Sequence, residues 1–359
     1  MFLVLGLILF VILIVVHEYG HFLVAKRNGV EVEEFGIGFP PKIGGKKLGK
    51  GIFRSYYSLN LLPLGGFVRL KGESDEDKRP GSFGAASLKV KTKITLAGVI
   101  VNFIAGAIIF SVLSVTGMPV LIDNQVSIGS DTTETLGPVR IGYLEENSPA
   151  EAAGLQLEDT LISFDRTQVT TEAALYDFTV ENAGETVTIT YERDGQESSV
   201  NVLLNQEPSE EGYLGVVPYQ ISTRQSTYSA PLNGVALAGQ FGWETLKGIG
   251  ETLGNVISGD VQEAGENVSG PVGIFVIFRN ISDVTLLMMF IGLLSVTLAV
   301  MNSLPIPALD GGRLAVMYLF RAIKKPLSTK TEQAIHSTGM VVLLFIIAVI
   351  SVVDVNRFF

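Results

Sequence analysis

Four apolar stretches dominate this sequence, and each approaches the roughly 20 residues that a helix needs to cross a bilayer. They run from about 2 to 25, 94 to 117, 284 to 301 and 339 to 353. The hydrophobic fraction of 47%, the charged fraction of 17% and the mean hydropathy of +0.40 fit bilayer-buried segments better than a purely soluble enzyme. No Lys or Arg precedes the first stretch and no small-residue cleavage site follows it, so we expect an anchor rather than a cleaved signal peptide. The sequence therefore predicts a polytopic α-helical membrane protein with about four transmembrane helices.

The distribution of charge predicts how these spans are oriented. Residues 26–93, between the first two stretches, hold 14 of the 26 Lys and Arg, whereas residues 118–283 hold 6 basic and 25 acidic residues. Because short cytoplasmic loops collect Lys and Arg, we expect both basic loops to face the cytoplasm. Both termini and the acidic domain then lie on the extracytoplasmic side. The low sequence pI of about 4.9 comes from that one domain, and nucleic acid is not expected as a partner.

The first apolar stretch contains a pattern typical of a zinc site. There is no cysteine in the chain, so a transition metal must be bound by His and carboxylate side chains. His17-Glu18-Tyr19-Gly20-His21 is an H-E-x-x-H motif, whose spacing puts both imidazoles on one face of a helix. Two imidazoles and one further ligand leave a position open for water, and Glu18 can accept that water's proton. A charged carboxylate in a membrane helix costs about 2.5–3.5 kcal/mol on insertion scales, which argues against a chance occurrence.

Two candidates for the third ligand are His336 and the carboxylates in or near the membrane, among which Asp310 is the strongest. Asp310 ends a segment, residues 302–310, in which two prolines interrupt an apolar span, and two glycines follow it. Irregular backbone at membrane depth is tolerated only where it is buried in protein or lines a wet cavity, which is where a site belongs. The alternative role for Asp310 is a helix cap at the membrane edge. We expect His336 in an interfacial loop or at a helix start. Lys26 ends the apolar run, so the metal would lie roughly 8–13 Å inside the cytoplasmic boundary.

The two motifs, HEYGH at 17–21 and NSLPIPALDGG at 302–312, together resemble the site-2 protease family of intramembrane zinc metalloproteases (peptidase family M50), in particular its bacterial branch that cleaves anti-sigma factors. Further similarities are PLGGFVRL at 63–70, AGVIVNF at 97–103, SGPVGI at 269–274 and the C-terminal DVNRFF. The resemblance implies a Zn²⁺-dependent hydrolase of the bacterial inner membrane. Its substrates would be single-span membrane proteins, of the anti-sigma-factor type or signal-peptide remnants, already shortened by another protease. The implied residue roles are zinc ligation by His17, His21 and Asp310, base catalysis by Glu18, and substrate binding by Asn302, Pro305 and Pro307.

Two further segments are expected to handle the substrate. Residues 136–207 alternate short β-like runs with turns and resemble a PDZ domain. The S-P-A-x-x-A-G-L sequence at 148–155 predicts a short helix next to strands, and residues 186–191 predict a strand that enters a turn at Asp194-Gly195. One such domain fits here, whereas the best-known enterobacterial relatives carry two. It could bind peptide termini by strand addition or act as a size-excluding cap. In the first basic loop, a membrane-associated β-loop is expected to pair with an unwound substrate near Gly65, Gly66 and Phe67.

The remaining segments complete the predicted organisation. Residues 232–257 suggest an amphipathic helix at the outer interface, or a packed helix of the acidic domain, and the acidic run at 73–79 suggests a solvated loop. A non-catalytic PDZ adaptor or membrane chaperone, and a zinc transporter, are the competing functions; a transporter usually shows internal repeats, which are absent from this sequence. The predicted divisions that contain the four spans are 1–28, 94–117, 284–320 and 338–359, and the third of these also contains the second zinc motif. The segments between them are the β-loop region 29–93, the PDZ-like domain 118–230, the interfacial segment 231–283 and the cytoplasmic loop 321–337.

Overall fold

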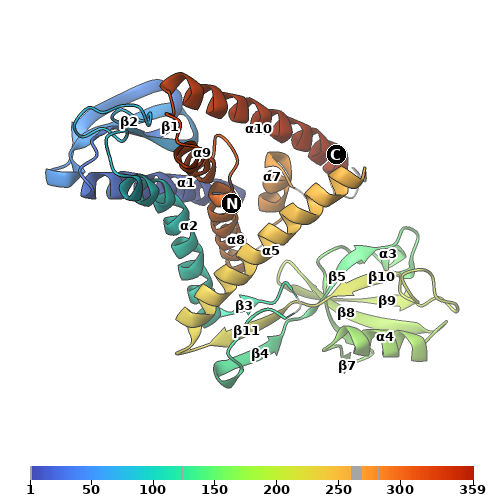
Figure 1. Ribbon diagram of the computed structural model, residues 1–359. Helices are drawn as coiled ribbons and strands as arrows, with labels where there is room; N and C mark the ends of the chain where they lie inside the picture. Colours follow the sequence, from blue (N-terminus) through green and yellow to red (C-terminus); the bar gives the residue numbers. More distant parts are fainter. Residues whose placement is uncertain (1, 123, 260–268, 282) are drawn as a thin grey trace. The chain divides into compact units, whose positions relative to one another are not determined.

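The computed structural model describes residues 2–122, 124–259, 269–281 and 283–359, and the chain divides into two compact units (Figure 1). The first, here called the helical unit, comprises Met1–Val115 and Tyr228–Phe359. The second, here called the β-domain, comprises Thr116–Thr227. The β-domain overlaps the predicted division 118–230, and the predicted division 231–283 falls in the helical unit. Residues 260–268 and 282, which belong to the division 231–283, lie outside the described residues.

Among the described residues, four helices of the helical unit are long and apolar enough to cross a membrane. The third agrees with the span predicted at 284–301 and ends at Ser303, before Pro305 and Pro307, which cannot continue a helix. The fourth begins at Thr329, ten residues before the apolar run, because Ser328 caps it by accepting a hydrogen bond from the Thr331 N–H. The helices are α1 (Phe2–Arg27), α2 (Leu88–Thr116), α5 (Ala230–Ser258), α7 (Pro271–Asn280), α8 (Val284–Ser303), α9 (Asp310–Ala322) and α10 (Thr329–Phe358).

Two apolar clusters show that the four long helices alternate in direction. One cluster joins the start of α1, the start of α8 and α7, through Leu13, Phe278 and Leu287. The Asp354 carboxylate, near the end of α10, accepts hydrogen bonds from Gly270 and Gly273 at the start of α7. Both chain termini therefore lie at one end of the unit. The other cluster joins the end of α1, the start of α2, the adjacent β-strands and α9, through residues such as Phe22, Ile94 and Met317.

Between α1 and α2 lies a sheet made from two long, bent strands, β1 (Val32–Leu48) and β2 (Ser55–Leu70), joined by the short helix η1 (Gly51–Phe53). Residues 55–59 of β2 pair with residues 44–48 of β1 and also with residues 34–37. Residues 66–70 pair with 32–37 on the other side. Each strand thus supplies two extended segments. We refer to this structure as the β-loop sheet.

The acidic segment 73–79 is not the solvated loop that we expected. Asp75 forms ion pairs with Lys91 of α2 and, at 3.1 Å, with Arg321 of α9. The Asp75 N–H donates to Glu332 of α10 at 2.9 Å, and Glu76 accepts a hydrogen bond from the Thr329 N–H. The segment therefore ties three helices together, through partners that are distant in the sequence.

The β-domain contains a sheet with the strand order β10-β5-β6-β8-β9, in which β7 also pairs with β6. The predicted strand at 186–191 is present, and it enters a turn at Asp194 and Gly195, both with positive φ. The predicted short helix at 149 is also present, capped by Ser148. The sheet's elements are β5 (Val139–Leu144), α3 (Pro149–Ala152), β6 (Thr160–Phe164), β7 (Thr167–Gln168), α4 (Glu172–Glu181), β8 (Thr186–Arg193), β9 (Gln196–Leu203) and β10 (Val216–Tyr219). A smaller sheet has β3 (Met118–Pro119), β11 (Ser222–Ser226) and β4 (Thr132–Leu136) in that order, and η2 (Gly129–Asp131) precedes β4.

The helix α5 belongs to the helical unit rather than to the acidic domain. Its buried side includes Leu237, Ala238 and Phe241, and the Phe241 ring contacts the Phe110 ring of α2 at 5.3 Å between centroids. Its other side exposes large apolar side chains such as Leu232 and Trp243. The prediction that this helix packs on the acidic domain is wrong. The alternative prediction, an amphipathic helix at the outer membrane interface, stays a prediction that the exposed apolar side supports.

Candidate metal centre

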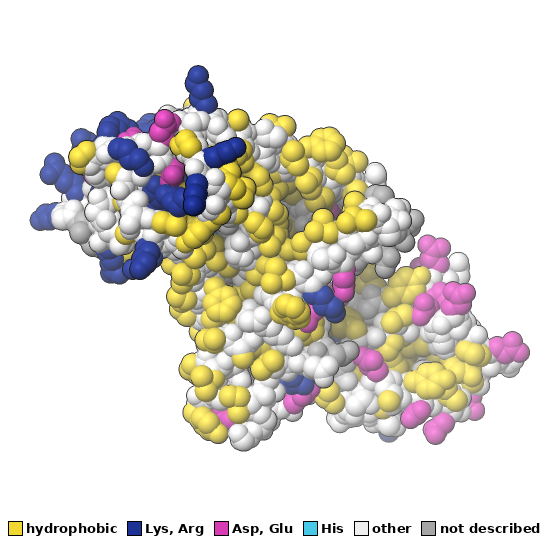
Figure 2. Space-filling view, in the orientation of Figure 1, with side chains coloured by type: hydrophobic (Ala, Val, Ile, Leu, Met, Phe, Trp, Pro, Cys, Tyr) yellow, Lys and Arg dark blue, Asp and Glu magenta, His cyan; other side chains and the backbone are white. Residues whose placement is uncertain are grey.

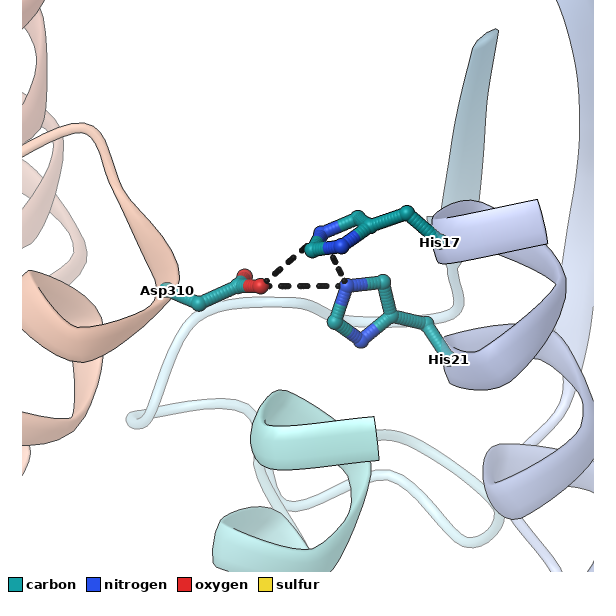
Figure 3. A group of neighbouring side chains, drawn as sticks. All are labelled: His17, His21 and Asp310. Carbon is teal, nitrogen blue, oxygen red and sulfur yellow. Dashed lines mark hydrogen bonds and ion pairs between the residues drawn. The ribbon is translucent and has the colours of Figure 1, made fainter. Parts of the chain in front are cut away.

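Three predicted ligands from two distant parts of the chain converge in the helical unit. His17 and His21 lie one turn apart on α1, and Asp310 is the first residue of α9 (Figure 3). The two Nε2 atoms are 3.2 Å apart, and each is 3.2 Å from Asp310 Oδ2. Both imidazoles are buried. His336, the other candidate for the third ligand, lies within α10 and is not part of this group.

The spacing of these three atoms fits a tetrahedral metal. Zinc bonds of about 2.0–2.1 Å to nitrogen and oxygen put neighbouring ligand atoms of a tetrahedron about 3.3–3.4 Å apart. The observed triangle has sides of 3.2 Å. Asp310 Oδ2 is buried, and although both Nε2 atoms lie near it, neither meets the angular requirements of a hydrogen bond. Three ligand atoms gathered this closely around a common point are the arrangement that a cation requires.

The protonation of His21 also suits metal binding. Its Nδ1 lies 2.7 Å from the carbonyl oxygen of Ile94 on α2. Since a carbonyl only accepts, we assign the proton of the neutral ring to Nδ1, which leaves a lone pair on Nε2 directed at Asp310. A backbone carbonyl behind a metal-binding His is a common way to fix the ring's orientation.

Gly98 of α2 forms the wall of the site, and the sequence analysis missed its role. A Cβ at this position would lie 2.5 Å from His21 Nε2 and 2.6 Å from His17 Nε2. No side chain larger than hydrogen fits there without displacing the two imidazoles. The signal was present in the AGVIVNF stretch, but nothing in the sequence says which face of that helix meets α1.

Two glycines after Asp310 allow its helix to start where it does. A Cβ on Gly311 would lie 2.2 Å from the carbonyl oxygen of Ser303, and one on Gly312 would lie 1.9 Å from that of Ile306. The first turn of α9 therefore packs directly against the backbone that leaves α8. This close approach holds Asp310 at the site, and it gives the Asp-Gly-Gly sequence a physical reason.

Glu18 lies next to the β-loop sheet. Its Cγ would be 3.6 Å from a Cβ on Gly66, which precedes Phe67 in β2. Gly65 is buried with φ +103°, a conformation that favours glycine. The predicted base and the predicted substrate-pairing segment, Gly65 to Phe67, are thus neighbours in the structure.

The other predicted substrate-binding residues lie in and just before the loop between α8 and α9. Asn302 donates to the Leu298 carbonyl of its own helix at 2.9 Å. Pro305 is exposed, and Pro307 packs where Gly339 of α10 has no side chain. Ala308, with φ +80°, donates its N–H to His336 Nδ1 at 3.1 Å. His336 therefore holds the loop that precedes Asp310.

A cavity of about 350 Å³ lies beside Asp310. Arg313, Glu332 and His336 contribute polar groups to its lining. The remaining lining residues are Glu73, Ser74, Ala308, Leu309, Asp310, Thr329, Gln333 and Met340.

Comparisons with known proteins identify the family of the chain. The family described as "Peptidase family M50" matches residues 5–346, which is most of the chain. The chain belongs to this family. It is accordingly a zinc metalloprotease, and the adaptor and transporter interpretations fall behind.

Three relatives cover nearly the whole chain. A Clostridium acetobutylicum protein named as a zinc metalloprotease is 28% identical over 356 residues, with 98% of this chain and 96% of the relative covered. Zinc metalloprotease RasP of Shouchella clausii is 28% identical, with 98% of both chains covered. Regulator of sigma-E protease RseP of Escherichia coli is 25% identical over 448 aligned positions, with 96% of both chains covered. Since this chain has 359 residues, RseP has residues that this chain lacks.

Among solved structures, the PDZ domain of an SdrC-like protein from Listeria monocytogenes matches 26% of this chain and 93% of its own, at 19% identity and a TM-score of 0.21.

Proposed function

We propose that this M50 protease hydrolyses peptide bonds of single-span membrane proteins within the membrane or at its edge. The observation that most directly supports this proposal is the triangle of His17, His21 and Asp310 inside a unit that contains four long apolar helices. His21 lies six residues before the end of α1, or roughly 9 Å along the helix. A catalytic group at that depth meets peptide bonds that lie in or near the bilayer.

In the proposed mechanism, His17, His21 and Asp310 hold the zinc ion, and Glu18 is the general base. When bound, zinc supplies a Lewis acid for water and for the scissile carbonyl. Glu18 accepts the proton of the attacking water at its carboxylate and returns it to the leaving amine. The wall at Gly98 and the Ile94 carbonyl keep both imidazoles in place during these proton transfers.

The substrate is proposed to bind as an extended strand along residues 65–67. A peptide bond inside an α-helix is shielded, so the scissile segment must unwind before attack, and an edge of the β-loop sheet can supply the lost hydrogen bonds. Residues 66–70 pair with 32–37, and no other strand in the described ranges pairs with them. Asn302, Pro305 and Pro307 are proposed to contact the substrate from the opposite side.

We place the protein in the bacterial inner membrane, with both termini and the β-domain outside and the site near the cytoplasmic side. The basic residues around the β-loop sheet and around α9 support this orientation through the positive-inside rule. The name of one relative, "Regulator of sigma-E protease RseP", supports our proposal that the substrate is of the anti-sigma-factor type. We propose that another protease cuts this substrate first. Signal-peptide remnants have the same single-span chemistry.

The β-domain is proposed to be a PDZ domain that meets the extracytoplasmic end of the substrate. Its strand β10 is at a sheet edge, and a cavity of about 80 Å³ lies between β10 and α4. Glu172 and Glu211 line that cavity, which disfavours an acidic terminus. A peptide receptor and a size filter both fit this geometry.

The experiment is co-expression with a tagged single-span reporter truncated outside the membrane. The wild type should cleave it, and Glu18→Gln and Asp310→Ala should lower cleavage by about 10²–10⁴-fold at equal expression. Glu18→Gln should still bind zinc, whereas Asp310→Ala should not. Cleavage by Glu18→Gln at the wild-type rate would refute the proposal.

A further inference from the structure

The exposed side chains of the β-loop sheet change from basic to apolar along the axis of α1. At one end, the carbonyl oxygen of Arg54 accepts a hydrogen bond from Lys26 Nζ at 2.8 Å, near the last residue of α1. At the other end, Gly65 lies beside Ile14. Twelve residues of α1 separate these two levels, or roughly 18 Å. The sheet therefore extends from the end of the first apolar helix to the depth of the metal centre.

The deep end of the sheet is apolar and exposed. Phe39 packs next to Gly65, and its side chain is 47% exposed. The neighbouring large apolar side chains that are also exposed are Ile37, Leu59, Leu61 and Leu62. At membrane depth, an apolar surface of this kind faces lipid tails and not water, so its exposure carries no hydrophobic penalty.

The shallow end is basic. Lys46, Lys47, Lys50 and Arg54 lie on the outer hairpin, and Figure 2 shows Lys and Arg side chains gathered over β1 and β2. Within the part of the chain that the structure describes, no ion pair or side-chain hydrogen bond is found for these four side chains.

The acidic residues at the same end are already matched. Glu31 pairs with Lys71, and Arg69 and Lys42 flank Glu34. Arg69 also reaches Glu33 at 3.5 Å. The outer hairpin is thus left with an uncompensated positive charge.

We propose that the outer hairpin, residues 42–54, binds the headgroups of anionic phospholipids through Lys46, Lys47, Lys50 and Arg54. Two apolar residues at this end, Leu48 and Phe53, are 50% and 42% exposed and lie between the basic ones in the sequence. Basic groups at a membrane surface attract anionic lipids, and adjacent apolar groups enter the acyl boundary. Bound lipid would fix the sheet, and its substrate-pairing edge, at one depth. An acidic protein segment is the competing partner.

The test uses the chain's single tryptophan, Trp243. In full-length Trp243→Phe, Phe53→Trp protein, the hairpin carries the only tryptophan, and bromine on lipid chains quenches it at short range. Nanodiscs would hold one fixed mixture of zwitterionic phosphatidylcholine and anionic phosphatidylglycerol. In one preparation the phosphatidylcholine is brominated, and in the other the phosphatidylglycerol is brominated. Quenching by brominated phosphatidylglycerol should exceed quenching by brominated phosphatidylcholine by at least about twofold.

Two variants show which residues are responsible. Changing Lys46, Lys47, Lys50 and Arg54 to Gln should bring the ratio to about one. The matched control changes four exposed basic residues outside the hairpin and should keep the ratio. If the two brominated lipids quench the protein with the unaltered hairpin equally, the proposal is wrong, and an acidic protein partner is favoured instead. The proposal is also wrong if the four changes to Gln leave the quenching ratio unchanged. Neither result depends on proteolytic activity. The control residues are Lys89, Lys93, Lys325 and Lys330.

Discussion

At the scale of single residues, the candidate metal centre depends as much on missing side chains as on its proposed ligands. The imidazoles of His17 and His21 rest against Gly98, and Asp310 reaches them because Gly311 and Gly312 let α9 begin against backbone. Ligand types can be recognised in a sequence from their spacing. The glycine that must face them cannot, because its role depends on which side of α2 meets α1.

Gly98→Ala tests this role of an absent side chain. The new Cβ would lie 2.5 Å from His21 Nε2, so the imidazoles must move and zinc affinity should fall at least about tenfold. The measurement is zinc bound per chain against a graded chelator. Gly239→Ala, at a helical position with open space around it, should bind zinc as the wild type does. Normal zinc affinity in Gly98→Ala would show that the wall is not needed.

At the scale of elements, α9 is positioned from both of its ends. Asp310 opens it in the metal centre, and Arg321 in its last turn pairs with Asp75. Asp75 also pairs with Lys91, whose side chain is only 1% exposed. The segment 73–79 thereby sets the distance between α9 and α2, and hence between Asp310 and the wall at Gly98.

Asp75→Asn should loosen this arrangement. It leaves Lys91 buried without a counter-charge, which costs about 3–5 kcal/mol of unfolding free energy. Thermal unfolding in detergent and the zinc affinity should both fall. Asp75→Glu should restore part of both, and Asp77→Asn, which disturbs a pair within the same segment, should change neither greatly. Unchanged stability in Asp75→Asn would contradict the role of this segment.

The same ion pairs predict an acid limit. Burial raises the pKa of Asp75, but Lys91 and Arg321 outweigh it and hold the pKa below its usual range. A lowered folded pKa adds stability at pH values above about 4, and this stability disappears as the pH falls through the folded value. The stability difference between wild type and Asp75→Asn, followed by thermal unfolding, should therefore be constant near neutrality and shrink below pH 4. A constant difference into strong acid would exclude this linkage.

Local patterns predicted most elements, and their failures were non-local. The apolar runs and the two prolines located the long helices and the break before Asp310, and Asp194-Gly195 located a hairpin. The run at 73–79 was misread as solvated because its partners lie at 91, 313, 321, 329 and 332. Charged residues next to one another in sequence say nothing about which distant helices will surround them.

At the scale of the whole molecule, the chain is a helical unit with a β-domain inserted between α2 and α5. The β-domain has its own apolar core, which includes Val139, Phe164 and Ile189. The proposed catalytic and substrate-pairing groups all belong to the helical unit. The insertion is therefore suited to selecting substrates rather than to cleaving them.

Replacing residues 118–226 with a short flexible linker tests this division of labour. A size filter predicts that the shortened protein cleaves single-span reporters with intact extracytoplasmic domains, which the wild type leaves uncut. A peptide receptor predicts instead a higher KM for truncated reporters. The measurement is cleavage of matched long and short reporters, with Glu18→Gln in the same background as control. Identical behaviour of full-length and shortened proteins would exclude both roles.

The most direct test of the account is to locate the bond that the purified protein cuts. Full-length protein and a truncated single-span substrate would be placed together in liposomes, and the products identified by mass spectrometry. We predict a cut inside or at the cytoplasmic edge of the apolar segment, abolished by Glu18→Gln and by zinc chelation, and restored by added zinc. A cut well outside that segment, or one that persists in Glu18→Gln, would contradict intramembrane proteolysis at this site.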